Sequence, residues 1–236
     1  MNWEKFKDKF HISWHTSVKK FIESNECNKI YAFLKKQTGE IAPKSHLTFR
    51  PFNMPLKDVK VVIIFEEPYS EKHNDTQYAD GIPLSCDYVD RMHPQLDAFY
   101  NAMEKEFYDL NLHTIKEKNL DFYISRGVLF LNSSFTTEID SPGKHKGLWV
   151  PFMKHLIKNV FTKHDIPIIF CGWEVQREYK SVLDPIYPWF IIQQPISKTS
   201  IGTPWSTENV FTKLNDYLWN ETNEEDIMWV NQEVPF

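Results

Sequence analysis

Four short apolar runs, each stopped abruptly by polar residues, constrain the fold of this chain more than any other feature. They cover residues 59–64, 128–131, 166–171 and 189–192, and amphipathic helical patterns separate the first three. Apolar runs without polar alternation are typical of strands buried on both faces of a parallel sheet. Strands that alternate with helices form βαβ units. We therefore expect an α/β fold with three layers, α/β/α, around a central four-stranded parallel sheet, in a single domain over residues 1–236.

The polar segments that end these runs should meet along one edge of the sheet, where open α/β sheets bind ligands. They are residues 66–69, 132–134, 172–174 and 193–199. Pro68 stops the first strand, so Glu66 and Glu67 should lie at its carboxyl end. The plainer interpretation of these two carboxylates is a solvated acidic turn between a strand and a helix.

Composition and charge narrow the function classes. The formal net charge of -5 argues against strong non-specific binding to nucleic acid, although a local basic groove stays possible. The three cysteines are widely spaced without a CxxC pair and the histidines are scattered, so we expect no metal site and no cofactor. The chain contains no apolar stretch near 18 residues and begins with a charged segment. We expect a soluble, cytoplasmic monomer that makes no membrane contact.

The order of five motifs resembles that of the family 1 uracil-DNA glycosylases. The motifs are VKVVIIFEEPY, ADGIPLS, GVLFLNSSFT, IIFCGWEVQ and QQPISKTS. In that family, three strands end in GQDPYHG, LLLN and WGS, and a fourth leads into HPSPLS. The likeness covers nearly the whole chain, and it implies a uracil-DNA glycosylase-like fold.

The resemblance also implies uracil-reading positions. Asn132 matches the Asn whose amide donates to uracil O4 and accepts from N3–H, a pattern that cytosine reverses. Tyr69 matches the Tyr that fills the space beside C5 and so rejects thymine. Leu84 stands where a Phe stacks on the base, and Glu66 belongs to the same substrate-binding set. The alternatives are a turn-forming side chain for Asn132 and ordinary core for Leu84.

Both catalytic positions of the family are substituted. Glu67 stands where the family has the Asp that orients the attacking water. Gln194 stands where it has the His that donates a hydrogen bond to uracil O2. A misplacement of one ångström can cost roughly a hundredfold in rate, and loss of one tuned donor about 10²–10³-fold. We expect severe loss of the chemistry.

The DNA-holding positions differ from the family as well. Trp173 replaces the phosphate-gripping Ser of WGS, Gln95 falls near the Ser of a proline-rich loop, and Lys198 aligns with the Leu wedge that enters the duplex. Extrusion of a base from duplex DNA needs such a wedge and grip. A polar loop over residues 70–80, longer than its family counterpart, should cover the pocket, supply a substitute donor or simply be solvated. Its candidate side chains are His73, Asp75 and Tyr78.

Three function classes are consistent with these residues. The first, which we favour, is a catalytically inactive or strongly impaired glycosylase homologue. It would bind single-stranded or uracil-containing DNA, or an inhibitor protein that mimics DNA. The second is an active glycosylase with altered chemistry, in which Glu67 orients the water and Gln194 is a weak donor. The third is a structural or replication-associated DNA-binding subunit.

Overall fold

A computed structural model describes residues 2–107, 115–195 and 206–230 of the chain. Its centre is a four-stranded sheet with strand order β5-β2-β7-β8, in which every neighbouring pair is parallel. The strands are β2 (Val61–Phe65), β5 (Val128–Asn132), β7 (Ile168–Cys171) and β8 (Trp189–Ile192). The predicted parallel sheet is thus confirmed.

Two strands begin later than their apolar runs, because a turn occupies the first residues of each run. The backbone N–H of Val59 closes a turn onto Leu56, and that of Ile166 closes one onto Phe161. The sheet ladder therefore starts at Val61 and Ile168. An apolar pattern cannot distinguish a buried turn from a buried strand.

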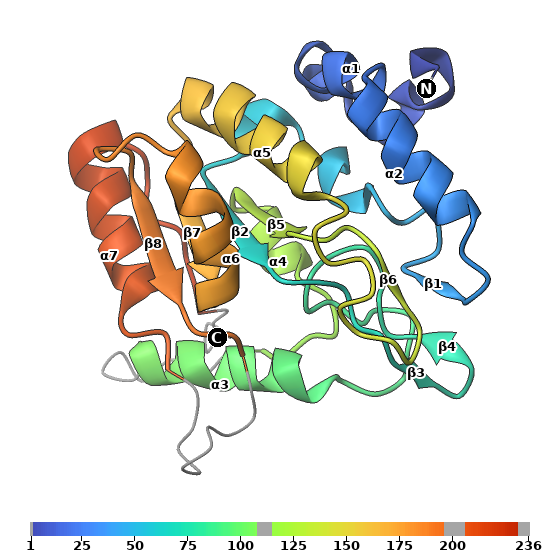
Figure 1. The fold of residues 1–236 in the computed structure, drawn as a ribbon. Coiled ribbons are helices and arrows are strands. Elements are labelled where there is room, and N and C mark those ends of the chain that lie inside the picture. The colour runs from blue at the N-terminus through green and yellow to red at the C-terminus, as the bar shows by residue number, and fades with distance from the viewer. Residues whose placement is uncertain (1, 108–114, 196–205, 231–236) are drawn as a thin grey trace.

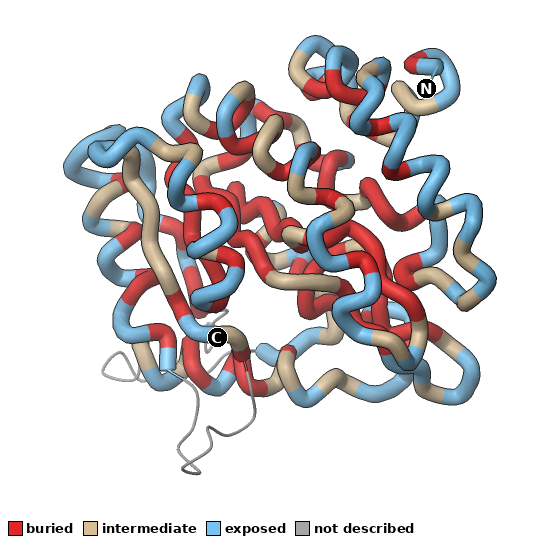
Figure 2. The backbone as a smooth tube through the Cα atoms, viewed as in Figure 1, coloured by how far each residue is buried: buried red, intermediate tan, exposed pale blue. Residues whose placement is uncertain are grey.

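Alternate residues of each strand supply two hydrophobic layers, as the side-chain period of two requires. Val62 and Ile64 pack on one side of the sheet, whereas Val61 and Ile63 pack on the other. The first layer is covered by α1 (His15–Ile22), α2 (Asn25–Lys35), α5 (Val150–Asn159) and α6 (Trp173–Tyr179). The second is covered by α3 (Pro94–Glu106), α4 (Asp121–Ile124) and α7 (Val210–Tyr217). This arrangement is the three-layer α/β/α architecture (Figures 1 and 2).

Two segments predicted as plain connections contain short strands. In segment 41–54, β1 (Ile41–Ala42) pairs antiparallel with β6 (Thr137–Glu138). In loop 70–80, β3 (Lys72–His73) and β4 (Thr76–Gln77) form a hairpin. Strands of two residues are too short to show a periodic pattern. The residue types of the hairpin turn do indicate a turn, since Asn74 and Asp75 both adopt the left-handed backbone that tight hairpins require.

The sequence at the start of α3 contains a helix-capping signal, which fixes where this helix begins. Pro94 occupies the first turn, and His93 Nδ1 accepts the Gln95 backbone N–H at 3.2 Å as the N-cap.

In the part of the chain that the structure describes, no helix combines the length and the apolar character needed to cross a membrane.

Candidate functional site

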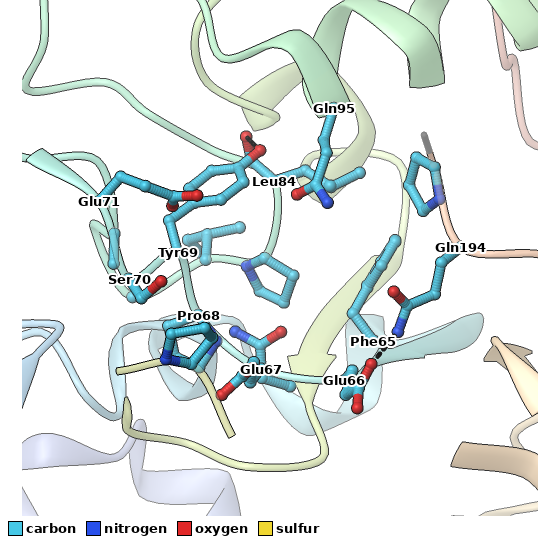
Figure 3. A pocket seen from close by; sticks show the side chains of 17 residues that line it. Phe65, Glu66, Glu67, Pro68, Tyr69, Ser70, Glu71, Leu84, Gln95 and Gln194 are labelled. Atoms are coloured by element: carbon cyan, nitrogen blue, oxygen red, sulfur yellow. Dashed lines mark hydrogen bonds between the residues drawn. The ribbon is translucent and has the colours of Figure 1, made fainter. Parts of the chain in front are cut away.

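A cavity of about 160 Å³ opens at the carboxyl ends of the parallel strands (Figure 3). Its volume is close to the roughly 150 Å³ at which an apolar cavity admits a benzene-sized ring. Seven residues singled out from the sequence line it, namely Glu66, Glu67, Tyr69, Leu84, Gln95, Asn132 and Gln194. These residues come from five separate segments of the chain, three of which lie at the carboxyl ends of strands of the parallel sheet.

Asn132 is the last residue of β5 and pairs with Phe65 across the ladder to β2. Its side chain is almost fully buried, with 5% of the residue exposed. Among the described residues, its Oδ1 has no hydrogen-bond partner. A buried polar atom without a partner costs about 1–3 kcal/mol. The wall of the cavity therefore offers an acceptor that a ligand N–H can satisfy.

Tyr69 forms a rigid neighbouring wall. Its hydroxyl donates to the Leu84 carbonyl at 2.9 Å, and its ring packs against the His93 ring with centroids 3.7 Å apart. Burial raises the pKa of Tyr69 well above its usual value, so the hydroxyl stays a neutral donor. Leu84 has a left-handed backbone with φ 65°, which a bulky residue adopts only when its surroundings hold it there.

The turn that carries Leu84 is held by a fully buried carboxylate, Asp80. Arg50 Nη1 pairs with Asp80 at 2.9 Å, and the Ile82 backbone N–H donates to it at 3.0 Å. The Ser85 hydroxyl also donates to Asp80. Burial raises the pKa of Asp80, and the Ser85 bond and Arg50 oppose that shift. The wall formed by Ile82 and Leu84 thus depends on a buried ion pair.

Glu67 is held in place by the loop that follows β6. Its two carboxylate oxygens accept the Gly143 backbone N–H at 2.9 and 2.8 Å, and Oε2 also accepts the Thr137 hydroxyl at 2.9 Å. Glu67 is therefore oriented and engaged, rather than being part of a freely solvated acidic turn.

Glu66 and Gln194 contact each other across the cavity mouth. Gln194 Nε2 donates to Glu66 Oε2 at 2.5 Å, as the dashed line in Figure 3 marks. Lys146 Nζ pairs with Glu66 Oε1 at 3.2 Å and also with Glu174. The hydrogen bond to Glu174 is the largest cause that raises the pKa of Lys146. One N–H of Gln194 is thus directed to a protein carboxylate.

Of the three residues predicted to hold DNA, the two that the structure describes lie in different hollows. Gln95 lies in the cavity wall at the start of α3. Trp173 is the first residue of α6 and lies outside this cavity, along a separate groove. Lys198 lies outside the described residues.

Loop 70–80 is exposed at its hairpin and buried over residues 77–80. Tyr78 is buried, with its ring 5.0 Å from that of His93, and His73 Nε2 lies 3.2 Å from an Asp90 carboxylate oxygen. The predicted donors His73, Asp75 and Tyr78 are not among the residues that line the cavity. The loop residues that do line it are Ser70, Glu71 and Ala79.

Three contacts were not anticipated from the sequence, namely those of Thr137, Gly143 and Lys146 with the two glutamates. Segment 140–147 shows no periodicity and was interpreted only as a loop. One weak signal was available, since this loop follows the strand that ends at Asn132 and must leave the same sheet edge. Over the described residues, no group of three or more His, Cys, Asp or Glu side chains is arranged to hold a metal ion.

Comparison with known proteins adds evidence that is independent of this geometry. No family model matches the chain. A uracil-DNA glycosylase of Borreliella burgdorferi is 30% identical over 218 residues, covering 89% of this chain and 92% of the relative. A uracil-DNA glycosylase of Streptococcus agalactiae is 29% identical over 228 residues, covering 94% and 99%.

Solved structures show the same fold. The mimivirus uracil-DNA glycosylase has a TM-score of 0.80 at 22% identity, covering 97% of this chain and 89% of that one. A point variant of the mimivirus protein in complex with UGI has a TM-score of 0.77 at 22% identity, covering 97% and 91%.

Proposed function

This chain belongs to the uracil-DNA glycosylase family, and from that membership we propose that it binds uracil, as the base or within DNA, while cleaving the N-glycosidic bond far more slowly than active members. The observation that carries the proposal is the cavity wall at Asn132, where a buried acceptor lacks a partner among the described residues. The hydrogen bonds that Glu67 and Gln194 already make with other protein groups support slow cleavage.

The recognition half of the proposal rests on complementarity of donors and acceptors. Uracil presents an N–H at N3, which satisfies Asn132 Oδ1, whereas cytosine presents a bare acceptor there and leaves both atoms unpaired. Two buried polar atoms left unpaired are costly, so a hydrogen-bonded site discriminates strongly against the wrong base. Tyr69 is fixed by its bond to Leu84 and its packing on His93, so it cannot move aside for a 5-methyl group.

The chemical half rests on groups that are already engaged. Glu67 accepts from Gly143 and Thr137, so its orientation is set by these donors rather than by a bound water. Gln194 Nε2 commits one of its two N–H groups to Glu66, so its orientation is set by that carboxylate rather than by uracil O2. Misplacement of the carboxylate costs roughly a hundredfold, and loss of the O2 donor about 10²–10³-fold. We expect excision at least about a thousandfold below that of an active member.

Glu66 adds an electrostatic reason for slow cleavage. Uracil leaves as an anion, and negative charge develops on its O2. A carboxylate hydrogen-bonded to Gln194 places like charge near that atom, which raises the barrier in a partly desolvated site. Lys146 offsets only part of this charge, because it is shared with Glu174.

A second candidate function is an active glycosylase with altered residues, and one observation favours it. Glu67 is held by two donors in the cavity wall, as a water-orienting carboxylate needs to be. A DNA-mimicking inhibitor protein is a further proposed partner, and the UGI complex of the mimivirus variant supports it.

The deciding experiment is a single-turnover excision assay on a single-stranded oligonucleotide that contains one uracil. The Borreliella burgdorferi relative serves as the active control. We expect the wild-type rate to be at least about a thousandfold lower, and the double variant Glu67→Asp, Gln194→His to recover at least about tenfold. Robust wild-type turnover that is lost in Glu67→Gln would contradict impaired chemistry and establish the second candidate.

A further inference from the structure

Trp173 is an unusual surface residue because most of its large indole is exposed. Its exposed fraction is 68%, although Trp is among the most buried residue types on average. It begins α6 directly after β7, at the carboxyl edge of the sheet. Exposure alone does not distinguish Trp173 from other surface residues, since Trp219, beyond the end of α7, is 63% exposed. The position of Trp173 beside the uracil cavity sets it apart.

Trp173 lies along an open groove of about 870 Å³, here called the Trp173 groove. The side chains that matter in it are Trp173, Arg177, Lys180, Leu183 and Trp189. The Lys180 ammonium lies 4.7 Å from the centre of the Trp189 ring. The groove thus combines two indoles with two cations.

The groove is linked to the uracil cavity by neighbouring residues and by an intermediate cleft. Gly172, the residue before Trp173, lies so close to Gln194 that an added Cβ would come within 2.9 Å of Gln194 Cγ. Glu174 lines both the groove and a cleft of about 190 Å³ whose wall includes Glu66 and Glu67. A strand with its uracil in the cavity can therefore follow this cleft and bring its next nucleotide to Trp173.

We propose that Trp173 stacks on the base of the nucleotide next to the bound uracil. The inference rests on the proposed function, because the uracil in the cavity anchors the strand. Aromatic side chains form sequence-tolerant stacking platforms for single strands. In a duplex the neighbouring base is already stacked and paired, so Trp173 is not free to take it without further unstacking.

The charges of the groove predict an unusual salt dependence. Arg177 and Lys180 are balanced by Glu174 and Asp184 along the same groove. Each phosphate neutralised on a single strand contributes about -0.7 to the slope of log K against log salt. With two cations, the groove supports a slope no steeper than about -1.4. Stacking itself requires no counterion release, so binding should persist at salt concentrations that release most DNA-binding proteins.

The test measures fluorescence anisotropy of a labelled single-stranded oligonucleotide with one central uracil. The proteins are the wild type, Trp173→Ala, Trp173→Phe and the matched control Trp219→Ala. We expect Trp173→Ala to weaken binding about 5- to 150-fold, the equivalent of about 1–3 kcal/mol. Trp173→Phe should retain most of the affinity, and Trp219→Ala should change nothing. Replacing the flanking nucleotides by abasic spacers should weaken the wild type but not Trp173→Ala.

Each contrary outcome identifies which claim fails. Equal affinities of Trp173→Ala and Trp219→Ala would overturn the stacking role. If the wild type still prefers a uracil over a thymine oligonucleotide in that case, the proposed function stands. Loss of that preference in the wild type would overturn the proposed function itself. If Trp173→Ala abolishes self-association in sedimentation while oligonucleotide affinity is unchanged, the groove joins copies of this chain and the inference is wrong.

Discussion

Replacing Asn132 by Leu should stabilise the unliganded protein and at the same time weaken uracil binding. Leu has a branched shape similar to that of Asn, and the cavity at this position leaves room for its larger volume. The substitution removes a buried acceptor, Asn132 Oδ1, that has no partner within the described part of the chain. It also removes the amide that we propose pairs with uracil.

The magnitudes follow from the hydrogen bonds. An unsatisfied buried acceptor costs about 1–3 kcal/mol, and its removal should raise the free energy of unfolding by that amount. At about 2–4 °C per kcal/mol for a chain of this size, the melting temperature should rise by about 2–12 °C. Uracil loses two hydrogen bonds of about 0.5–1.5 kcal/mol each, so its affinity should fall about 5- to 150-fold.

Differential scanning calorimetry and isothermal titration with uracil measure the two effects. The matched control is Asn215→Leu, because the Asn215 amide is fully used. Its Nδ2 donates to the Ile227 carbonyl at 3.0 Å, and its Oδ1 accepts from Ile227 N and Trp229 Nε1 at 3.1 Å. This control should lose stability. A lower melting temperature for Asn132→Leu, or unchanged uracil affinity, would refute the role of Asn132.

Three other predictions concern the surroundings of the cavity. Glu66→Gln removes the charge near uracil O2 and should raise residual excision about tenfold, or about 1.4 kcal/mol, in the single-turnover assay. Arg50→Ala leaves Asp80 buried without its cation and should cost about 3–5 kcal/mol in urea unfolding, whereas a surface-like loss below 1 kcal/mol would contradict the buried pair. Burial lowers the pKa of His93 to about 4, so the unfolded state takes up the proton first. Stability should therefore fall from about pH 6.5 to pH 4, by at most about 3 kcal/mol because solvent reaches part of the ring. His93→Asn, which keeps an N-cap acceptor, should lose less over the same pH range in thermal melts.

The sheet and the assembly of the cavity were accessible from the sequence for a simple physical reason. Buried parallel strands leave uninterrupted apolar runs, and their carboxyl ends must share one edge. Asn132 and Gln194 could therefore be assigned to one site, although 62 positions separate them in the printed sequence.

The groups that fix Glu67 were not accessible in this way. Thr137 and Gly143 contact it across 70 and 76 positions of sequence, and neither lies in a segment with a periodic pattern. β6 has only two residues, and its pairing with β1 depends on how the chain packs around the finished sheet. Contacts of this kind are products of tertiary packing, which local sequence patterns do not encode.

The central claim is that the protein binds a uracil in DNA but cleaves its N-glycosidic bond only slowly. One measurement tests this claim directly. The protein is incubated with a single-stranded oligonucleotide containing one uracil, the complex is isolated by gel filtration, and the recovered oligonucleotide is weighed by mass spectrometry. We predict co-elution of protein and oligonucleotide, and an abasic fraction that grows at least about a thousandfold more slowly than with the Borreliella burgdorferi relative. Abasic product formed at a rate comparable to that of the relative, or failure of the two molecules to co-elute, would contradict the account.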